Sequence, residues 1–286
     1  HIQSWSTTFS PKATLNLLPL LGADGKGTLS ALSLGYTGEY ALYHAHDARL
    51  EDHARHFLTQ ALKIKSGAWS STFDNSFLWV DGTTSTPHYR LSSPYGAAGP
   101  RERREQLQDR AKLALRYDEE AWFIRAAASL LYYDLRTELH PASGAYAGWQ
   151  NFVDRYDFNG GLDGGFKVAK DWALTLGHRY GWQYQQPYPW DARTNKATYH
   201  RVLLGIEGKL TPWLKAEVVL GPDFRHYTEA TRGIAGVNYT WLHTEGSLTA
   251  DLSKNDSLSL THKVWHWVSS TGITAYRDSA YALTYR

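Results

Sequence analysis

The sequence contains no cysteine and no methionine. Without cysteine the chain has no disulfide, no thiol nucleophile, no Fe–S cluster and no zinc ribbon. Methionine is missing even at position 1, where His1 stands. We therefore interpret the chain as a processed or trimmed product in which no signal peptide remains to be read.

The sequence also lacks a dominant charge and long apolar runs. Its 30 Lys and Arg nearly balance 28 Asp and Glu, and a formal charge of +2 is too small for a global nucleic-acid-binding protein. The mean hydropathy is −0.47, and the absence of apolar runs of about 18 residues excludes a transmembrane helix. A transmembrane β-barrel remains compatible, because its strands need an apolar residue only at every second position.

What the sequence does contain is a repeated alternation of apolar and polar residues. Segment 172–185 shows it most clearly, since one face carries Trp172, Leu174, Leu176 and Trp182. Aromatic residues stand at both ends of this face and aliphatic residues between them. A lipid-facing strand requires this order, with hydrocarbon at mid-depth and amphipathic rings at the two headgroup levels.

The same alternation predicts strands along most of the chain, separated by connections that alternate in length. The other clear segments are 30–43, 68–80, 110–117, 121–133, 151–168, 198–210 and 213–225. Short turns are predicted at 118–120, 169–171, 211–212 and 253–256, and longer loops near 44–56, 82–104, 138–149, 186–197, 227–232 and 270–277. Short turns at one end and long loops at the other are typical of outer-membrane barrels.

We therefore predict an all-β fold, a transmembrane antiparallel up-and-down β-barrel that forms one domain over residues 1–286. The expected strand number is 14, with 12 and 16 as alternatives. About 12 strands follow residue 28, and segment 2–21, which has a mixed pattern and contains Pro11 and Pro19, contributes two more.

In this architecture the chain resembles the bacterial outer-membrane β-barrel proteins of the porin type. Tyr281, Leu283 and Tyr285 alternate up to the C-terminus, like the signal that the barrel-assembly machinery reads in that class. The class usually ends on an aromatic residue, whereas this chain ends on Arg286, so we expect either a clipped terminus or further missing strands. The resemblance implies an outer-membrane location, with outer-membrane lipid, lipopolysaccharide and the assembly machinery as partners.

Alternation also predicts which charged side chains face the interior. Nine are predicted to line a pore: Arg110, Arg125, Arg155, Arg179, Arg201, Glu207, Lys215, Glu217 and Arg225. A ring of arginines on a pore wall favours anions. The alternative is that these charges pair with carboxylates on neighbouring strands and hold the wall rigid.

Two further groups of side chains have the chemistry of binding sites. His53 and His56, three residues apart, could share one helix face as metal ligands, but we favour a solvated loop with a short helical turn. Trp265 and Trp267 flank His266. Strict alternation turns both tryptophans inward, where they could stack on a sugar ring, whereas a bulge turns them to lipid; we favour the lipid-facing position.

These observations favour a porin-like channel for the passive diffusion of small hydrophilic solutes, with a mild preference for anions. The alternative is a plugged barrel that serves as a structural anchor or as a subunit of a surface assembly. An outer-membrane enzyme is less favoured, since no G-x-S-x-G motif is present. A soluble carbohydrate-binding β protein is also less favoured, since its apolar strand faces would not carry aromatic residues at both ends. We expect no catalytic residue, no metal, no cofactor and no nucleic-acid partner, and we leave oligomerisation open.

Overall fold

A computed structural model describes residues 5–44, 52–82, 104–134, 154–186, 195–229, 238–268 and 275–285. These residues form 14 strands and one 3-10 turn, Pro19–Leu21. The strands are Ser6–Phe9 (β1), Lys12–Asn16 (β2), Leu29–Tyr43 (β3), His53–Ser66 (β4), Trp69–Gly82 (β5), Arg104–Asp118 (β6), Trp122–Asp134 (β7), Arg155–Ala169 (β8), Trp172–Gln185 (β9), Asn195–Thr211 (β10), Leu214–Glu229 (β11), Asn238–Asp251 (β12), Ser257–Val268 (β13) and Ala275–Tyr285 (β14). No helix within these ranges is long and apolar enough to cross a membrane.

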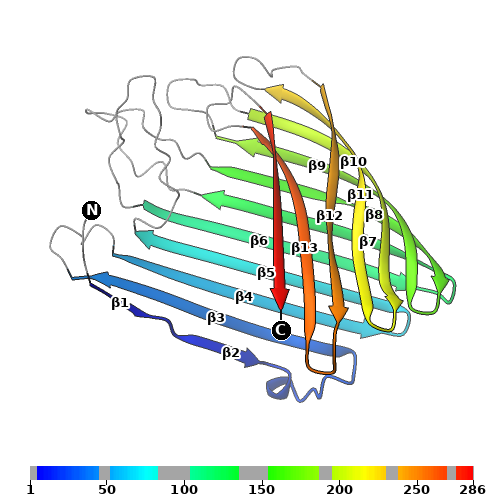
Figure 1. The fold of residues 1–286 in the computed structure, drawn as a ribbon, viewed down its shortest axis with the longest axis horizontal. Helices are drawn as coiled ribbons and strands as arrows, with labels where there is room; N and C mark the ends of the chain where they lie inside the picture. Colours follow the sequence, from blue (N-terminus) through cyan, green and yellow to red (C-terminus); the bar gives the residue numbers. More distant parts are fainter. Residues whose placement is uncertain are drawn as a thin grey trace.

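All 14 strands belong to one antiparallel sheet, in which each strand from β3 onward pairs with the next strand in the sequence (Figure 1). The predicted all-β class, the up-and-down topology and the strand number are therefore confirmed. The two N-terminal strands β1 and β2 pair with the two halves of β3 and meet at Pro11. Proline donates no ladder hydrogen bond, so it is tolerated at this edge of the sheet.

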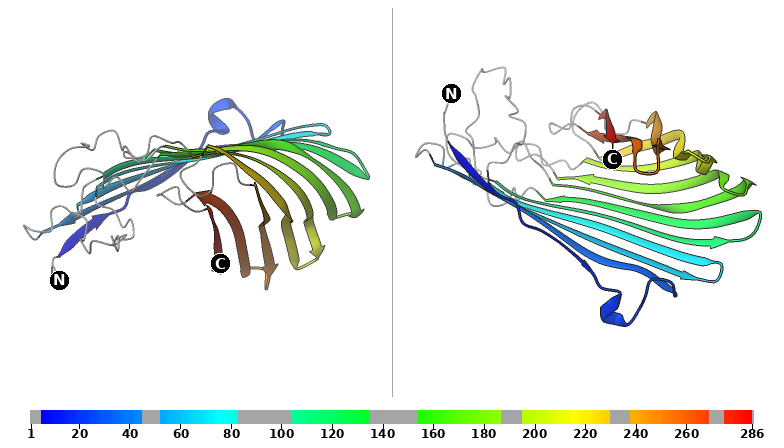
Figure 2. Two further views of the ribbon diagram at one scale, coloured as in Figure 1. Left: turned by 90° about the horizontal axis from the view of Figure 1, so that it is seen from above. Right: turned by 60° about the horizontal axis from the view of Figure 1, so that its bottom comes forward.

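The sheet has the architecture of a barrel wall that is not closed. Seen from above, it is gently curved over β1 to β6 and curls strongly from β8 onward, so that β12–β14 turn back beneath its concave face (Figure 2). Among the described residues, β14 pairs only with β13, while β1 and β2 pair only with β3. Closure of the barrel would therefore have to pair one edge of the sheet, β14, with the other edge, which β1 and β2 form together.

The connections confirm the predicted alternation in length. Short turns at 67–68, 119–121, 170–171, 212–213 and 252–256 join the strands at one end, which we call the turn end. Gly67 turns the chain between β4 and β5 with a φ of 57°, in the left-handed region that glycine enters without steric cost. The longer predicted connections all fall at the opposite end, the loop end, and lie mostly outside the described residues.

The loop predicted near 44–56 is shorter than expected. β4 begins at His53, which pairs with Ala41 of β3 and Gly82 of β5, so the helical turn expected over His53 and His56 is wrong. In a strand, residues three positions apart point to opposite faces. His53 Nε2 accordingly lies 3.1 Å from Glu39 Oε1 on one face, and His56 Nδ1 lies 3.0 Å from the Tyr36 hydroxyl on the other. The two imidazoles do not form a common metal site.

The two faces of the sheet differ in the way that the alternation predicts. Along β9, Ala173, Thr175 and Gln183 on the concave face are buried, whereas Leu174 and Leu176 on the convex face are 47% and 58% exposed. We call the concave face the inner face and the convex face the outer face. The polar residues thus face inward and the apolar residues face the surroundings, the reverse of a soluble protein.

Aromatic residues recur on the outer face at a fixed spacing. Four strands place aromatic side chains ten positions apart: Trp69 and Trp79, Trp122 and Tyr132, Tyr156 and Phe166, and Trp172 and Trp182. Ten residues span about 33 Å along a strand, or about 25 Å across a bilayer at a tilt of about 40°. At the turn end the rings of Trp69 and Tyr117 lie 4.9 Å apart, and at the loop end those of Tyr156 and Trp182 lie 4.8 Å apart. The rings therefore form two belts rather than isolated residues.

Candidate functional site

The inner face of β6–β13 carries a network of charged and polar side chains that reach across the concave space. The Lys112 ammonium of β6 lies 3.5 Å from Glu245 Oε1 of β12, and Lys263 of β13 lies 3.4 Å from the same oxygen. Strands that are far apart in the sheet are therefore joined by side chains. We call this region the filled sector, and the inner face of β3–β5 the open sector.

One cluster lies toward the turn end and joins β6, β7, β8, β9 and β10. Asp163, with a side chain only 5% exposed, accepts hydrogen bonds from Arg125 Nε at 2.8 Å and from Arg179 Nη1 at 2.6 Å. Arg125 also donates to Glu207 Oε2 at 2.7 Å, and Arg116 donates to Glu207 Oε1. The buried Asp163 and the half-buried Glu207 thus each meet two guanidinium groups, which compensates for the loss of hydration.

A second cluster lies toward the loop end, on β8–β11. Asp223 is fully buried and accepts hydrogen bonds from Arg201 Nε at 2.7 Å and from Arg225 Nη2 at 3.1 Å. Both guanidinium groups also lie over the Tyr199 ring, 4.2 and 4.4 Å from its centroid. The Tyr199 hydroxyl donates to Asp157 Oδ1 at 2.7 Å. The polar groups of this cluster therefore serve as hydrogen-bond and ion-pair partners of one another.

Glycines on adjacent strands make room for the large inner side chains. In the strand register Phe123 faces Gly165, Asp163 faces Gly177, and Tyr199 faces Gly181. A Cβ atom on any of these glycines would overlap the Phe123 ring, the Asp163 carboxylate or the Tyr199 ring respectively. Each bulky side chain thus lies flat over a glycine of the neighbouring strand, which lets the sheet curl tightly with a packed interior.

The charges of these two clusters nearly balance. Five arginines (Arg116, Arg125, Arg179, Arg201 and Arg225) stand beside five carboxylates (Asp118, Asp157, Asp163, Glu207 and Asp223), and Lys167 Nζ lies 3.3 Å from Asp118 Oδ1, which leaves an excess of one basic group. Five predicted pore-lining residues lie in these clusters: Arg125, Arg179, Arg201, Glu207 and Arg225. The sequence places them on the correct face, but their charges are directed at one another.

The other four predicted residues lie outside the two clusters. Arg155 Nη1 lies 3.5 Å from the Tyr276 hydroxyl of β14. Lys215 Nζ lies 3.2 Å from Asp251 Oδ2 near the turn end. Arg110 lies opposite Ser76 in the β5–β6 register and Glu217 lies opposite Glu207 in the β10–β11 register, and both side chains are exposed. The nine residues therefore do not converge on one constriction.

The stretch of β13 around His266 departs from strict alternation. The β12–β13 ladder, as far as the described residues show it, ends at the Glu245–Lys263 pair. Beyond it β13 lies against the interior, where the His266 carbonyl oxygen accepts from Gln183 Nε2 at 3.0 Å and from Arg225 Nη1 at 3.1 Å. Trp267 lies beside Gln183 and Tyr227 at a small cavity. The lipid-facing position favoured for Trp267 is therefore wrong.

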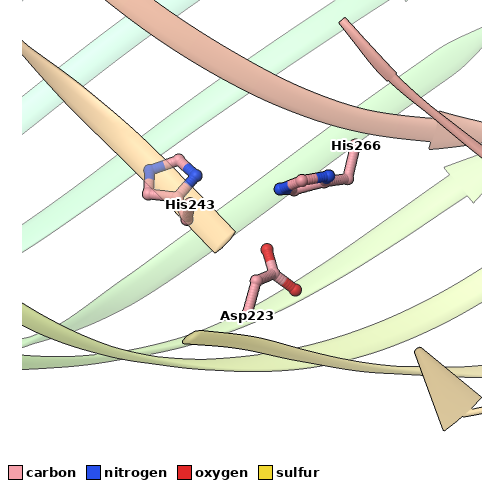
Figure 3. A group of neighbouring side chains, drawn as sticks. All are labelled: Asp223, His243 and His266. Atoms are coloured by element: carbon pink, nitrogen blue, oxygen red, sulfur yellow. The ribbon is translucent and has the colours of Figure 1, made fainter. Parts of the chain in front are cut away.

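Three side chains beside the loop-end cluster have the chemistry of metal ligands. Asp223, His243 and His266 come from β11, β12 and β13 and point toward one another (Figure 3). Their ligand atoms all lie within 4.8 Å of one another. The sequence prediction did not select His243 or Tyr199. For Tyr199 a signal existed, because a glycine, Gly181, stands at the matching position of the neighbouring strand.

Comparison with models of known protein families and with curated protein sequences gives no match. Among solved structures, the chain is similar to the closed form of the ferric-catecholate import receptor Fiu from Escherichia coli K12. The identity is 11% and the TM-score is 0.41, with 93% of this chain and 50% of the receptor covered. The chain thus spans about half the length of that receptor.

Proposed function

We propose that this chain forms a β-barrel wall in the outer membrane of a bacterium. The outer face supports this, because it exposes aliphatic side chains such as Leu176 and Leu204, 58% and 59% exposed, over many strands. Soluble monomers rarely expose apolar patches larger than a few hundred Å². The ten-residue spacing of the aromatic belts, about 25 Å across the bilayer, fits the apolar band of such barrels.

Within that setting, we propose that the protein acts as an occluded barrel, a membrane anchor or a subunit of a surface assembly. The observation that carries this proposal is the burial of the loop-end cluster, in which Asp223, Tyr199 and Arg225 are 0–1% exposed. Water-filled pores keep their charged wall residues hydrated, because removing a charge from water costs several kcal/mol unless it is paired. Here the charges are paired and dry, which favours a structural role for the filled sector.

A porin-like channel for small hydrophilic solutes is the second candidate, and the open sector favours it. The inner face of β5 carries Ser70, Thr72, Asp74 and Ser76, and the Asp74 side chain is exposed. A closed barrel could pass solutes along this strip. The anion preference expected from the arginines loses its main support, because the five arginines of the clusters face five carboxylates.

Current measurements across a planar bilayer distinguish the two candidates. For the refolded chain in a KCl gradient, the occluded barrel predicts no discrete current steps. Discrete steps with a stable reversal potential would contradict it and favour the channel. The Arg201→Glu variant sharpens the test. In a channel this change shifts the reversal potential toward cations, whereas in an occluded barrel it places a carboxylate beside Asp223 and destabilises the fold.

A further inference from the structure

We propose that Asp223, His243 and His266 bind a divalent transition-metal ion that fastens β11, β12 and β13 together. The ion is one that prefers imidazole ligands, namely Cu²⁺ or Zn²⁺, rather than Mg²⁺ or Ca²⁺. The proposal does not depend on whether the barrel conducts, since the site belongs to the packed interior.

The two imidazoles of the proposed site are buried. His243 and His266 are 3% and 1% exposed. Among the residues that the structure describes, His243 Nδ1 and both ring nitrogens of His266 are buried without a hydrogen-bond partner. A buried polar atom without a partner costs about 1–3 kcal/mol, so native proteins rarely keep several of them in one place. A bound metal ion gives one nitrogen of each ring a partner.

The type and spacing of the three ligand atoms also favour a metal ion. Two histidines and one carboxylate form a common three-residue set for catalytic zinc and related ions, with a fourth position left to water. Ligand atoms around a tetrahedral zinc ion lie about 3.3 Å apart, since each is about 2.0 Å from the metal. In this structure the three ligand atoms lie within 4.8 Å of one another. Side-chain rotations that bring the atoms about 1.5 Å closer would complete the site.

The position of the three side chains in the sheet also favours a metal ion. His243 precedes Glu245 on β12, and His266 follows Lys263 on β13, so both lie just beyond the last pair of the β12–β13 ladder. An ion held by both histidines would connect the two strands where the ladder hydrogen bonds stop. Asp223 of β11 pairs with Trp241 of β12, so the same ion would also connect the next strand.

The surrounding charges determine which ions can bind. Asp157 accepts the hydrogen bond of the Tyr199 hydroxyl, and Glu245 Oε2 lies 3.9 Å from His243 Nε2. Arg201 and Arg225 hold the Asp223 carboxylate. The two guanidinium groups orient the carboxylate as an outer shell does in other metal sites. Their positive charge opposes a cation, so binding must depend on the two nitrogen ligands. This is why hard ions that prefer oxygen are excluded from the prediction.

Copper binding to the refolded full chain tests the proposal directly. After chelator treatment, one equivalent of Cu²⁺ should give an electron paramagnetic resonance spectrum with two coordinated nitrogens, and Zn²⁺ should compete with it while Ca²⁺ should not. His243→Gln and His266→Gln should each weaken binding at least 10-fold, since outer-shell changes alone cost about that much.

The outer face provides a matched control. His178 Nε2 and His200 Nδ1 lie 3.2 Å apart there, and both side chains are exposed. His200→Gln should leave copper binding unchanged. A spectrum that loses its nitrogen couplings in His200→Gln but keeps them in His266→Gln would overturn the proposal. So would the absence of a two-nitrogen spectrum in the folded wild-type protein, a result that requires no variant.

Discussion

The open and filled sectors of the sheet use the same alternation to build different interiors. On β5 the inner face carries small polar residues such as Thr72 and Ser76, and the exposed Asp74 stands opposite Lys112. On β8–β11 the inner face alternates glycines with large charged or aromatic residues, as in the pair of Gly181 and Tyr199. Period-two patterning thus determines which face a side chain lies on, whereas side-chain size across the strand register determines whether that face encloses water.

The largest difference between the sectors should appear when a buried carboxylate is removed. Asp163→Asn removes the negative charge that Arg125 and Arg179 share, and breaking a buried ion pair costs about 3–5 kcal/mol. The matched change Asp74→Asn in the open sector should cost less than about 0.5 kcal/mol, as exposed substitutions usually do. Urea unfolding in detergent micelles, followed by tryptophan fluorescence, measures both. Equal costs would contradict the distinction between the sectors.

Two adjacent glycines of β8 give the second comparison. Gly165→Ala places a Cβ atom against the Phe123 ring, which is 1% exposed and covered by the Arg116 guanidinium 3.5 Å from its centroid. Because the ring cannot yield, we expect a loss of about 1–3 kcal/mol in unfolding free energy. Gly164→Ala meets no atom within 4 Å, so it should be neutral or stabilise by about 0.5–1 kcal/mol.

A rescue experiment identifies the cause of the Gly165 effect. Adding Phe123→Leu to Gly165→Ala should recover part of the lost stability, because the smaller side chain leaves room for the new methyl group. If the double variant is as unstable as the sum of the single changes, the contact between Phe123 and Gly165 is not responsible. The same unfolding measurement serves for the wild type, the two single variants and the double variant.

The smallest effect should come from the turn that holds the last strand. Asp256 accepts hydrogen bonds from Ser253 Oγ at 2.5 Å and from the Tyr285 hydroxyl at 2.6 Å. These bonds hold the pKa of the Asp256 carboxyl below its usual value. A lowered pKa means that the folded state binds fewer protons. This stabilisation is therefore present above the unfolded pKa and is lost as the pH falls through the folded pKa.

Hydrogen exchange of the β14 amides measures that effect between pH 2 and pH 6. Wild-type protection at the C-terminal end of β14 should fall in acid, and Asp256→Asn should remove this part of the pH dependence. An Asp256→Asn protein with an unchanged pH profile would show that the carboxylate does not hold the strand. The filled sector should remain protected in both proteins.

The sequence predicts the strands and their faces well, because both follow from a local period of two. Alternation alone places Arg179 and Arg225 inward, and the structure keeps them there. The partners of these residues could not be predicted, since they depend on curvature. Arg116 and Glu207 meet although they lie 91 residues apart, and nothing local to either residue indicates the contact.

Other departures have physical reasons of the same kind. His53 was expected in a loop, but ladder partners on both β3 and β5 extend β4 to include it. The inward position of His266 contradicts simple alternation. After Lys263, β13 leaves the β12 ladder, and the edge of β13 that faced β12 gains contacts with the interior instead. His243 gave no local signal, since its role depends on two other strands meeting it.

The measurement that tests the account most directly is cysteine labelling of the inner face. The chain has no cysteine of its own, and Thr72 and Thr175 each lie three positions from the first residue of a strand, Trp69 and Trp172 respectively. With a charged, membrane-impermeant maleimide, Thr72→Cys in the open sector should label rapidly. Thr175→Cys, at a position 7% exposed in the filled sector, should label only after unfolding. Equal labelling rates in the folded protein would show that the filled sector holds water and would contradict the occluded barrel.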